Sequence, residues 1–300
     1  MQITKLSQIF EVLKSKPKKR LSVAFANDEH TIEAAYNAVE LGLVSAVLTG
    51  NKSVIEEICS KHNMDASKFE ILDEPNDVKA ANLAVKVIND GKADVLMKGS
   101  LSTDKYMRAI LNKVTGLIDE KAILSHVTVM EYPNYPRLLT IGDVAVIPLP
   151  DLKQKIKIID YLVNVSKTLG VETPKVAAIA ATEQMLAAMP ACVEGAILAK
   201  MSDRGQIKGC IVDGPLALDT AIDPESVAIK KVKGEVAGQA DCLLFPNIET
   251  GNAFFKSGTK LGGAELAAYV AGARVPCVLT SRGDSALTKT YSIALAALMA

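Results

Sequence analysis

The sequence predicts an α/β protein made of two lobes, each with helices packed on a mostly parallel sheet. Short apolar runs alternate with amphipathic stretches along most of the chain, which is the pattern of parallel strands joined by helices. This alternation breaks near residue 123, where two strand-like runs separated by prolines favour a hairpin. The 300 residues, 49% of them hydrophobic, are enough for two cores.

The first part of the chain predicts four strand–helix pairs. Strands are expected at 21–25, 45–50, 69–74 and 93–99, and helices at 31–43, 52–62, 77–89 and 103–114. The last of these helices has Thr103 or Asp104 as its expected N-cap. Loops between the elements are short, as in a doubly covered parallel sheet.

The second part begins with the hairpin and then returns to alternation. Hairpin strands are expected within 122–133 and 137–148, further strands at 175–180, 209–216, 240–247 and 276–280, and helices at 151–170, from near Glu183, over 251–273 and at 285–300. The predicted lobes are residues 1–130 with 281–300, and residues 131–280. The last helix therefore returns to the first lobe.

Composition excludes several classes of protein. A formal net charge of zero and a pI near 6.8 give no broad attraction to nucleic acid or to anionic membranes. The stretch "MQITKLSQIFEVLKSKPKKR" is an amphipathic helix pattern without the features of a signal peptide, and no apolar run is long enough to cross a bilayer. The five cysteines form no C-x-x-C pair, which predicts free thiols in a reducing cytoplasm. The sequence contains no cluster of histidine and cysteine residues, so it does not predict a metal site.

The loop "MKGSLSTDKYMR" is the first candidate anion site. Lys98 ends a strand, Ser102 and Thr103 follow in the loop, and Arg108 lies about a turn into the helix. Hydroxyls, backbone N–H groups and two cations together suit a phosphate or carboxylate. An ordinary helix cap with solvated charges is the alternative.

The stretch "VLTSRGDS" is the second candidate anion site. Ser281 and Arg282 lie where a strand gives way to a helix, which in an α/β protein is the edge of the sheet where small molecules bind. Arginine offers a forked positive charge for an anion, and the first helical turn offers unpaired N–H groups.

Two aspartates follow apolar runs in the second part of the chain. Asp143 lies between two such runs in "TIGDVAVIP", where it could orient a substrate group or pair with a neighbouring structural group. Asp213 begins an expected tight turn at 213–215, and a ligand role there is a further hypothesis.

The loop "LLFPNIETGN" adds three candidate binding residues. Asn247 follows a strand, Gly251 would let a ligand approach the backbone, and Asn252 could cap the next helix. The chain carries neither the glycine-rich nucleotide motifs nor the G-x-S-x-G elbow, so nucleotide hydrolysis, a standard dinucleotide site and an esterase site lose support.

With these loops in view, the whole chain resembles the phosphate acetyl/butyryltransferase family. The stretches that carry the resemblance are "GDVAVIPLPDLKQKIKIID", "AKMSDRGQIKGCIVDGPLALD", "VAGQADCLLFPNIETGN" and "VPCVLTSRGDSALTKTYSIALA". The resemblance implies reversible transfer of a short acyl group, with four carbons or a branch, between coenzyme A and phosphate. Acetyl transfer is the alternative within the family.

The resemblance also implies an architecture and a setting. The fold would be two α/β/α lobes with the site in the cleft, similar to isocitrate and isopropylmalate dehydrogenases. The protein would be a cytoplasmic homodimer or larger homo-oligomer. It would use coenzyme A as a substrate and would hold no metal or prosthetic group.

The family's site residues map onto two of the loops. Ser281 would hydrogen-bond the thiol sulfur or the developing charge, and Arg282 would hold phosphate and polarise the acyl carbonyl. Arg108, with Ser102 and Thr103 beside it, falls where the family has a second phosphate-binding arginine.

The sequence departs from the family at the expected base. The acetyltransferases carry an aspartate seven residues after the serine, where this chain has Thr288. Asp284 is an available carboxylate at a different offset, and the base for the thiol stays unassigned. No cysteine lies in a motif for an acyl-enzyme, so we expect a ternary complex with direct attack by the thiolate.

Two rivals from other classes stay open. A dehydrogenase acting on a hydroxy acid would show metal-binding aspartates and a nucleotide loop, which the sequence lacks. A two-lobed anion-binding protein without catalysis would close on its ligand but would normally be exported.

Overall fold

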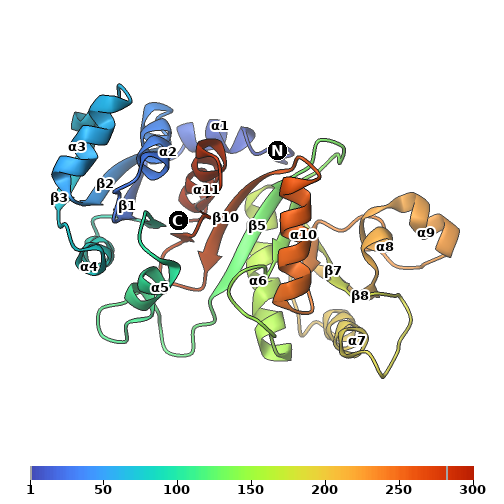
Figure 1. The fold of residues 1–300 in the computed structure, drawn as a ribbon. Coiled ribbons are helices and arrows are strands. Elements are labelled where there is room, and N and C mark those ends of the chain that lie inside the picture. The colour runs from blue at the N-terminus through green and yellow to red at the C-terminus, as the bar shows by residue number, and fades with distance from the viewer. Residues whose placement is uncertain (1, 282) are drawn as a thin grey trace. The chain divides into compact units, whose positions relative to one another are not determined.

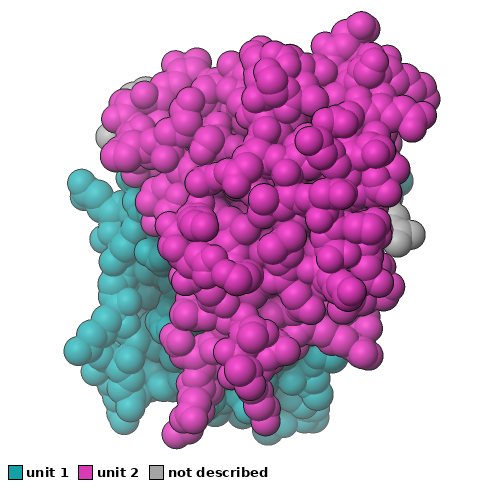
Figure 2. Space-filling view, turned by 90° about the vertical axis from the view of Figure 1, so that its left-hand side faces the viewer, with its two compact units in different colours: residues 1–5, 125–265 teal, residues 6–124, 266–300 magenta. Residues whose placement is uncertain are grey.

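The computed structural model describes residues 2–281 and 283–300, which form two compact units. Unit 1 consists of the N-terminal stretch up to Lys5 and residues 125–265. Unit 2 consists of residues 6–124 and 266–300. Figure 2 colours unit 1 teal and unit 2 magenta.

The sheet of unit 2 is parallel except at one end. Its strands are β1 (Lys19–Ala24), β2 (Val44–Gly50), β3 (Phe69–Asp73), β4 (Val95–Lys98), β10 (Glu265–Ala271) and β11 (Cys277–Val278), in the order β3-β2-β1-β4-β11-β10. Strands β3 to β11 of this order run parallel, and β10 pairs antiparallel with β11. Strand β4 is buried along its whole length, as expected for a central strand covered on both faces.

Helices cover both faces of this sheet. They are α1 (Gln8–Lys14), α2 (Glu29–Glu40), α3 (Lys52–Lys61), α4 (Asp77–Asn89), α5 (Thr103–Leu111) and α11 (Ala286–Met299), with a short 3₁₀ turn, η1 (Ala66–Lys68). Helix α11 packs against α1 and α2, whereas α4 packs against α5 (Figure 1). The strand–helix alternation predicted for this part of the chain is therefore confirmed.

Unit 1 combines a hairpin with parallel strands. Its strands are β5 (Ser125–Glu131), β6 (Leu139–Gly142), β7 (Lys175–Ile179), β8 (Ile211–Leu216) and β9 (Cys242–Leu244), in the order β5-β6-β9-β7-β8. Its helices are α6 (Leu152–Thr168), α7 (Pro190–Asp203), α8 (Leu218–Ile222), α9 (Pro224–Lys230) and α10 (Ile248–Lys260). Strand β5 is antiparallel to β6, which confirms the hairpin, and the other pairs are parallel.

The helix expected over 251–273 is wrong in its second half. Helix α10 ends at Lys260, and residues Glu265–Ala271 form strand β10. Six of the seven β10 residues are buried, so the strand shows no alternation of apolar and polar residues. A short run buried on both faces has no period that separates a strand from a helix.

The tight turn expected at 213–215 is also wrong. Asp213, Gly214 and Pro215 lie inside strand β8, which pairs with β7 as the last strand of its sheet. The register of this pair shifts between Ala177 and Ile179, so the chain is irregular where the proline lacks a donor. Proline is tolerated in an edge strand at such an irregularity.

Helix α5 begins at Thr103 as predicted but has another N-cap, and helix α7 begins at another residue than predicted. The side chain of Ser102 accepts from the N–H of Lys105 and is the N-cap of α5, one residue before the expected caps. Helix α7 begins at Pro190 rather than near Glu183, with proline in the first turn, where its missing N–H costs nothing.

The division of the chain differs from the expected one over residues 266–280. Strand β11 covers only Cys277–Val278 of the strand expected there, and it pairs with β4 through Leu96 and Met97. Residues 266–280 therefore belong to unit 2, together with α11. Among the described residues, no helix is both long and apolar enough to span a membrane.

Candidate active site

Three parallel strands of unit 2 end together at one edge of its sheet. Ala24 at the end of β1 lies opposite Lys98 at the end of β4, and Val278 at the end of β11 lies opposite Met97. The loops that follow these strands must therefore lie close together. Carboxyl ends of parallel strands are the usual place for a ligand in an open α/β sheet.

Backbone hydrogen bonds hold two of these loops against each other. The N–H of Gly99 donates to Ala24 O and the N–H of Ser100 donates to Phe25 O, both at 2.9 Å. A Cβ at Gly99 would collide with the carbonyl oxygen of Phe25, so only glycine fits there. The loop after β4 thus has a fixed position beside the loop after β1.

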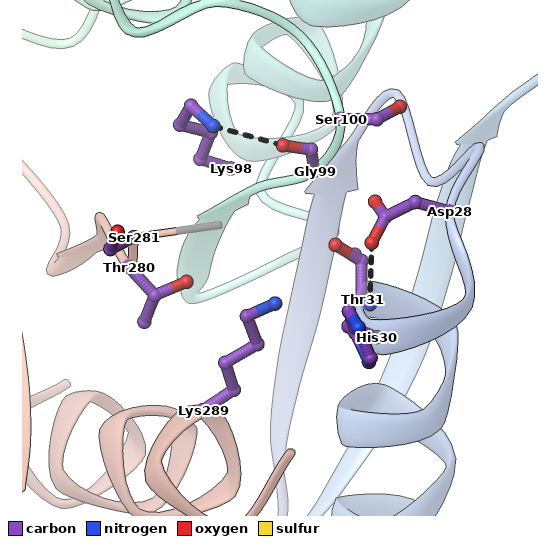
Figure 3. Close-up of a pocket in the computed structure, with 9 residues that line it drawn as sticks. All are labelled: Asp28, His30, Thr31, Lys98, Gly99, Ser100, Thr280, Ser281 and Lys289. Atoms are coloured by element: carbon purple, nitrogen blue, oxygen red, sulfur yellow. Dashed lines mark hydrogen bonds between the residues drawn. The ribbon is translucent and has the colours of Figure 1, made fainter. Parts of the chain in front are cut away.

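A cavity of about 210 Å³ opens at this edge, entirely within unit 2 (Figure 3). It is lined by the loop after β1 and the start of α2, the end of β4, the loop after β11, and α11. The lining residues are Asp28, His30, Thr31, Lys98, Gly99, Ser100, Thr280, Ser281 and Lys289. They combine two ammonium groups, a carboxylate, an imidazole and several hydroxyls.

Both lysines of the cavity are buried. Lys98 is 6% exposed and Lys289 is 4% exposed. Lys98 Nζ donates to Gly99 O at 3.1 Å. Two buried ammonium groups give this small cavity positive charge, which favours an anion as the ligand.

Asp28 lies on the opposite wall, at the start of α2. Its Oδ1 accepts from the N–H of Thr31 at 3.0 Å and caps the helix. Its Oδ2 is buried and has no hydrogen-bond partner. A carboxylate oxygen of this kind can accept a hydrogen bond from a ligand.

The Ser281 loop is closed by Asp284. The N–H of Ser281 donates to Asp284 Oδ2 at 2.7 Å, and Ser281 Oγ accepts from the N–H of Gly283 at 3.4 Å. Ser285 then caps α11 through the N–H of Thr288. Ser281, one of the predicted site residues, lies in the cavity lining, whereas the predicted Arg282 lies outside the described residues.

The predicted residues on α5 have other partners. Ser102 is the helix cap and Thr103 is the first helical residue. Arg108 Nε donates to Asp104 Oδ1 at 3.1 Å, and its side chain is 79% exposed. Of the first anion loop, Lys98, Gly99 and Ser100 line the cavity, whereas Ser102, Thr103 and Arg108 do not.

The carboxylate of Asp143, in unit 1, is hydrogen-bonded by neighbouring residues of the same unit. It is 2% exposed, and its two oxygens accept five hydrogen bonds. The donors are Ser125 Oγ and the backbone N–H groups of His126, Ala145, Val146 and Ile147. A carboxylate has about four lone-pair sites, so this geometry favours the structural alternative.

The other predicted residues of unit 1 make local contacts. Asn247, not Asn252, is the N-cap of α10, with Oδ1 accepting from Thr250 at 2.9 Å. Asn252 lies within the helix and donates from Nδ2 to Val144 O at 3.0 Å. A Cβ at Gly251 would collide with the backbone oxygen of Asp143, so the protein itself fills the space expected for a ligand.

Asp213 is half-buried on β8. Its Oδ1 accepts from the N–H of Gly214 at 2.8 Å, and burial raises the pKa of its carboxyl group. Such a carboxyl retains its proton more readily than an exposed aspartate does. Its contacts do not identify a ligand.

Three of the five cysteines lack the character of nucleophiles. Burial raises the pKa of the Cys210 thiol to about 11 and that of the Cys277 thiol to about 12. Burial also raises the pKa of Cys242 well above the ordinary range. Because the thiolate is the reactive form, these thiols are inert near neutral pH.

Several cavity residues escaped the sequence reasoning. These are Asp28, His30, Thr31, Thr280 and Lys289. One signal was available, since Lys289 stands in a helix whose other residues are mostly apolar and buried. Among the described residues, no group of three or more histidine, cysteine, aspartate or glutamate side chains is placed to hold a metal ion.

Comparison with known proteins identifies the family. A family model described as "Phosphate acetyl/butaryl transferase" matches residues 53–297, which include β4, the Ser281 loop and most of α11. A phosphate butyryltransferase from Clostridium acetobutylicum is 47% identical over 298 residues, covering 99% of each chain. The chain belongs to the phosphate acetyl/butyryltransferase family. The resemblance stated from the sequence is confirmed.

Other members of this family are similar over the same length. A phosphate acetyltransferase from Thermotoga maritima is 42% identical, covering 98% of this chain and 99% of its own. The crystal structure of a branched-chain phosphotransacylase from Enterococcus faecalis V583 has a TM-score of 0.83 at 27% identity, covering 94% of this chain and 98% of that one. The mixed α/β fold is thus the fold of phosphotransacylases.

Proposed function

We propose that this chain is a phosphate acyltransferase that transfers a short acyl group, butyryl in the first instance, between coenzyme A and inorganic phosphate. Acyl-CoA and phosphate give acyl phosphate and free coenzyme A, and the reaction is reversible. The observation that carries the proposal is the pair of buried lysines beside Ser281, in a chain that matches the family from residue 53 to residue 297.

The chemistry needs an anion site and a group near the reacting carbonyl. The cavity supplies two ammonium groups for the anion, and Ser281 supplies a hydroxyl. A hydroxyl placed there can donate to the carbonyl oxygen as negative charge develops on it, or to the sulfur of the departing thiolate. Arg282, next to Ser281 in sequence, would add a third cation.

The size of the cavity favours a small ligand. Pockets for drug-sized ligands have volumes of about 300–1,000 Å³. At about 210 Å³, this cavity suits phosphate or a short acyl phosphate rather than the nucleotide end of coenzyme A. We infer that it receives the reacting end of the substrates.

The acyl preference rests on the relatives. The relative with 47% identity is a phosphate butyryltransferase, and the Enterococcus faecalis protein is called a branched-chain phosphotransacylase. The Thermotoga maritima relative is a phosphate acetyltransferase, so acetyl transfer is the alternative. One methylene contributes only about 1–3 kcal/mol to discrimination between substrates, and the preference needs a direct measurement.

The proposal also covers the cellular location, the oligomeric state and the cofactor requirement of the protein. We propose a homo-oligomer in the cytoplasm, with coenzyme A as substrate and no bound cofactor. A two-lobed arrangement like that of isocitrate dehydrogenase stays a prediction from the resemblance.

The deciding experiment follows release of free coenzyme A thiol with a colorimetric reagent. Purified protein is mixed with phosphate and acetyl-CoA, butyryl-CoA or isobutyryl-CoA, and a parallel run omits phosphate to measure hydrolysis. We expect phosphate-dependent release that is fastest with the four-carbon substrates.

Each other outcome changes the proposal in a defined way. Fastest release from acetyl-CoA would keep the reaction and replace the acyl preference. No release from any of the three would overturn the proposed function and favour an anion-binding protein without catalysis. Size-exclusion chromatography with light scattering would test the oligomer.

A further inference from the structure

We propose that the cavity of unit 2 is a subsite for hydrogen phosphate, in which Lys289 supplies positive charge and Asp28 accepts a hydrogen bond from the phosphate hydroxyl. The inference deepens the proposed function, on which it rests for the identity of the anion. It assigns binding roles to two residues outside the predicted Ser281 and Arg108 loops.

The case for Lys289 begins with its surroundings. Its side chain extends from α11 into the cavity, between Thr280 and the first turn of α2 (Figure 3). The residue is 4% exposed in a helix that is mostly apolar and buried. Among the described residues, no carboxylate lies within ion-pair distance of its ammonium group.

A second buried lysine shows what a purely structural lysine looks like in this chain. Lys155 on α6 is 3% exposed, and its ammonium group forms a salt bridge with Glu194. A buried charge normally has such a partner. Because Lys289 is equally buried and lacks one, we infer that a ligand anion is its partner.

The case for Asp28 rests on its second oxygen. Oδ1 is engaged as the cap of α2, whereas Oδ2 is buried without a partner. A buried acceptor left unpaired is costly, so a donor is expected there when the ligand is bound. Asp28 and Lys289 line the same cavity.

Hydrogen phosphate satisfies both requirements at once. Its charged oxygens can accept from the Lys289 ammonium, and its remaining hydroxyl can donate to Asp28 Oδ2. Sulfate has the same shape but no proton near neutral pH, so the Asp28 carboxylate would repel it. The pair of residues therefore predicts a preference for phosphate over sulfate.

Binding can be measured without turnover, by thermal shift and by isothermal titration calorimetry. The wild-type protein is titrated with sodium phosphate and with sodium sulfate at pH 7 and equal ionic strength. A ligand that binds only the folded state raises the Tm. We expect phosphate to raise the Tm and sulfate to raise it much less.

Two substitutions test the two roles. Lys289→Met keeps the length and removes the charge, and we expect it to weaken phosphate binding at least about tenfold. Asp28→Asn keeps the helix cap, since asparagine caps well, and can donate to any tetrahedral oxyanion. We expect Asp28→Asn to reduce the phosphate-to-sulfate affinity ratio about tenfold. Lys289→Gln is a second variant of the lysine if Lys289→Met folds poorly.

A matched control is Lys86→Met, since Lys86 is an exposed lysine of the same unit that pairs with Asp90. It should bind phosphate as the wild type does. Unchanged phosphate affinity in both Lys289 variants would overturn the role of that residue. An unchanged preference over sulfate in Asp28→Asn would overturn the role of Asp28.

A further arm separates free phosphate from the phosphate groups of coenzyme A. Adenosine 3′,5′-bisphosphate is titrated in place of phosphate. We expect Lys289→Met to leave its affinity unchanged, and a tenfold loss there would place a coenzyme A phosphate in the cavity instead. Phosphate binding that depends on Lys289 in a protein without acyl transfer would retain this inference and overturn only the proposed function.

Discussion

The backbone N–H of Ser281 donates to the Asp284 carboxylate, with 2.7 Å between nitrogen and Oδ2. The Asp284 carboxylate, which the sequence analysis considered as a candidate base, thus accepts a hydrogen bond from the loop that carries Ser281. In this geometry Asp284 positions Ser281. Substitutions of Asp284 can distinguish this positioning role from a role as the catalytic base.

Asp284→Ala should lower turnover about 10–100-fold, because small displacements of a reacting group have effects of that size. Asp284→Asn should restore most of it, since an amide oxygen can accept the same hydrogen bond but is no base at neutral pH. Steady-state kinetics with butyryl-CoA measure both. Equal loss in the two variants would show that Asp284 acts as the base.

Ser281→Ala should lower kcat about 10²–10³-fold with little change in KM, if its hydroxyl stabilises developing charge. Arg282→Ala should lower kcat/KM for phosphate by a similar factor. Circular dichroism would check that both variants fold. Arg204→Ala, a control at an exposed arginine after α7, should have wild-type kinetics. Wild-type kinetics in Arg282→Ala would remove that residue from the mechanism.

Asp143→Ala should destabilise the protein by more than about 2 kcal/mol, because five donors would lose a buried charged acceptor. Urea unfolding followed by circular dichroism measures this as a lower midpoint. Asp160→Ala on the exposed side of α6 should leave the midpoint within error. A normal midpoint with a raised KM for phosphate would return Asp143 to the binding site.

The protein should lose stability as the pH rises above about 9. Burial raises the pKa of Cys277 from 9.0 to about 12 and raises that of Tyr106 well above 10.0. These folded-state pKa values exceed the unfolded ones, so the stabilisation is complete below the unfolded pKa and decreases as pH increases toward the folded pKa. Urea midpoints at pH 8 and pH 10 measure the loss.

Cys277→Ala removes one of these groups and should show a smaller decrease in midpoint between pH 8 and pH 10 than the wild type. The comparison uses the change with pH within each protein, so a general loss of packing in the variant does not affect it. An identical decrease in both proteins would show that the Cys277 thiol does not contribute.

Local signals were enough for much of the fold. The strands around Val23, Leu48 and Leu96 are buried on both faces, and the helices between them have a polar face, so each element is recognisable within its own residues. The strand at 265–271 was missed because it closely follows a helix, and full burial leaves it no alternation that would separate it from that helix. The turn expected at Asp213 failed because strand pairing overrode local turn preference.

The candidate site likewise contains one part that the sequence could predict and another that it could not. Ser281 could be placed from sequence, because the end of a strand and the start of a helix are both local features. Asp28 and Lys289 could not be brought together, since one caps α2 near the start of the chain and the other lies on α11 near its end. Their meeting depends on β1, β4 and β11 ending at one edge.

The sequence by itself determined the family and the α/β class and predicted an anion site at the Ser281 loop, because these depend on residue types at short spacing. Only the tertiary structure decided which charges share a cavity and which are neutralised elsewhere. It paired Arg108 with Asp104, enclosed Asp143 within its own loop, and left Lys289 and Asp28 Oδ2 facing one small cavity. Whether a buried charge has a partner is settled by the packing of distant segments, which a linear pattern of residues does not record.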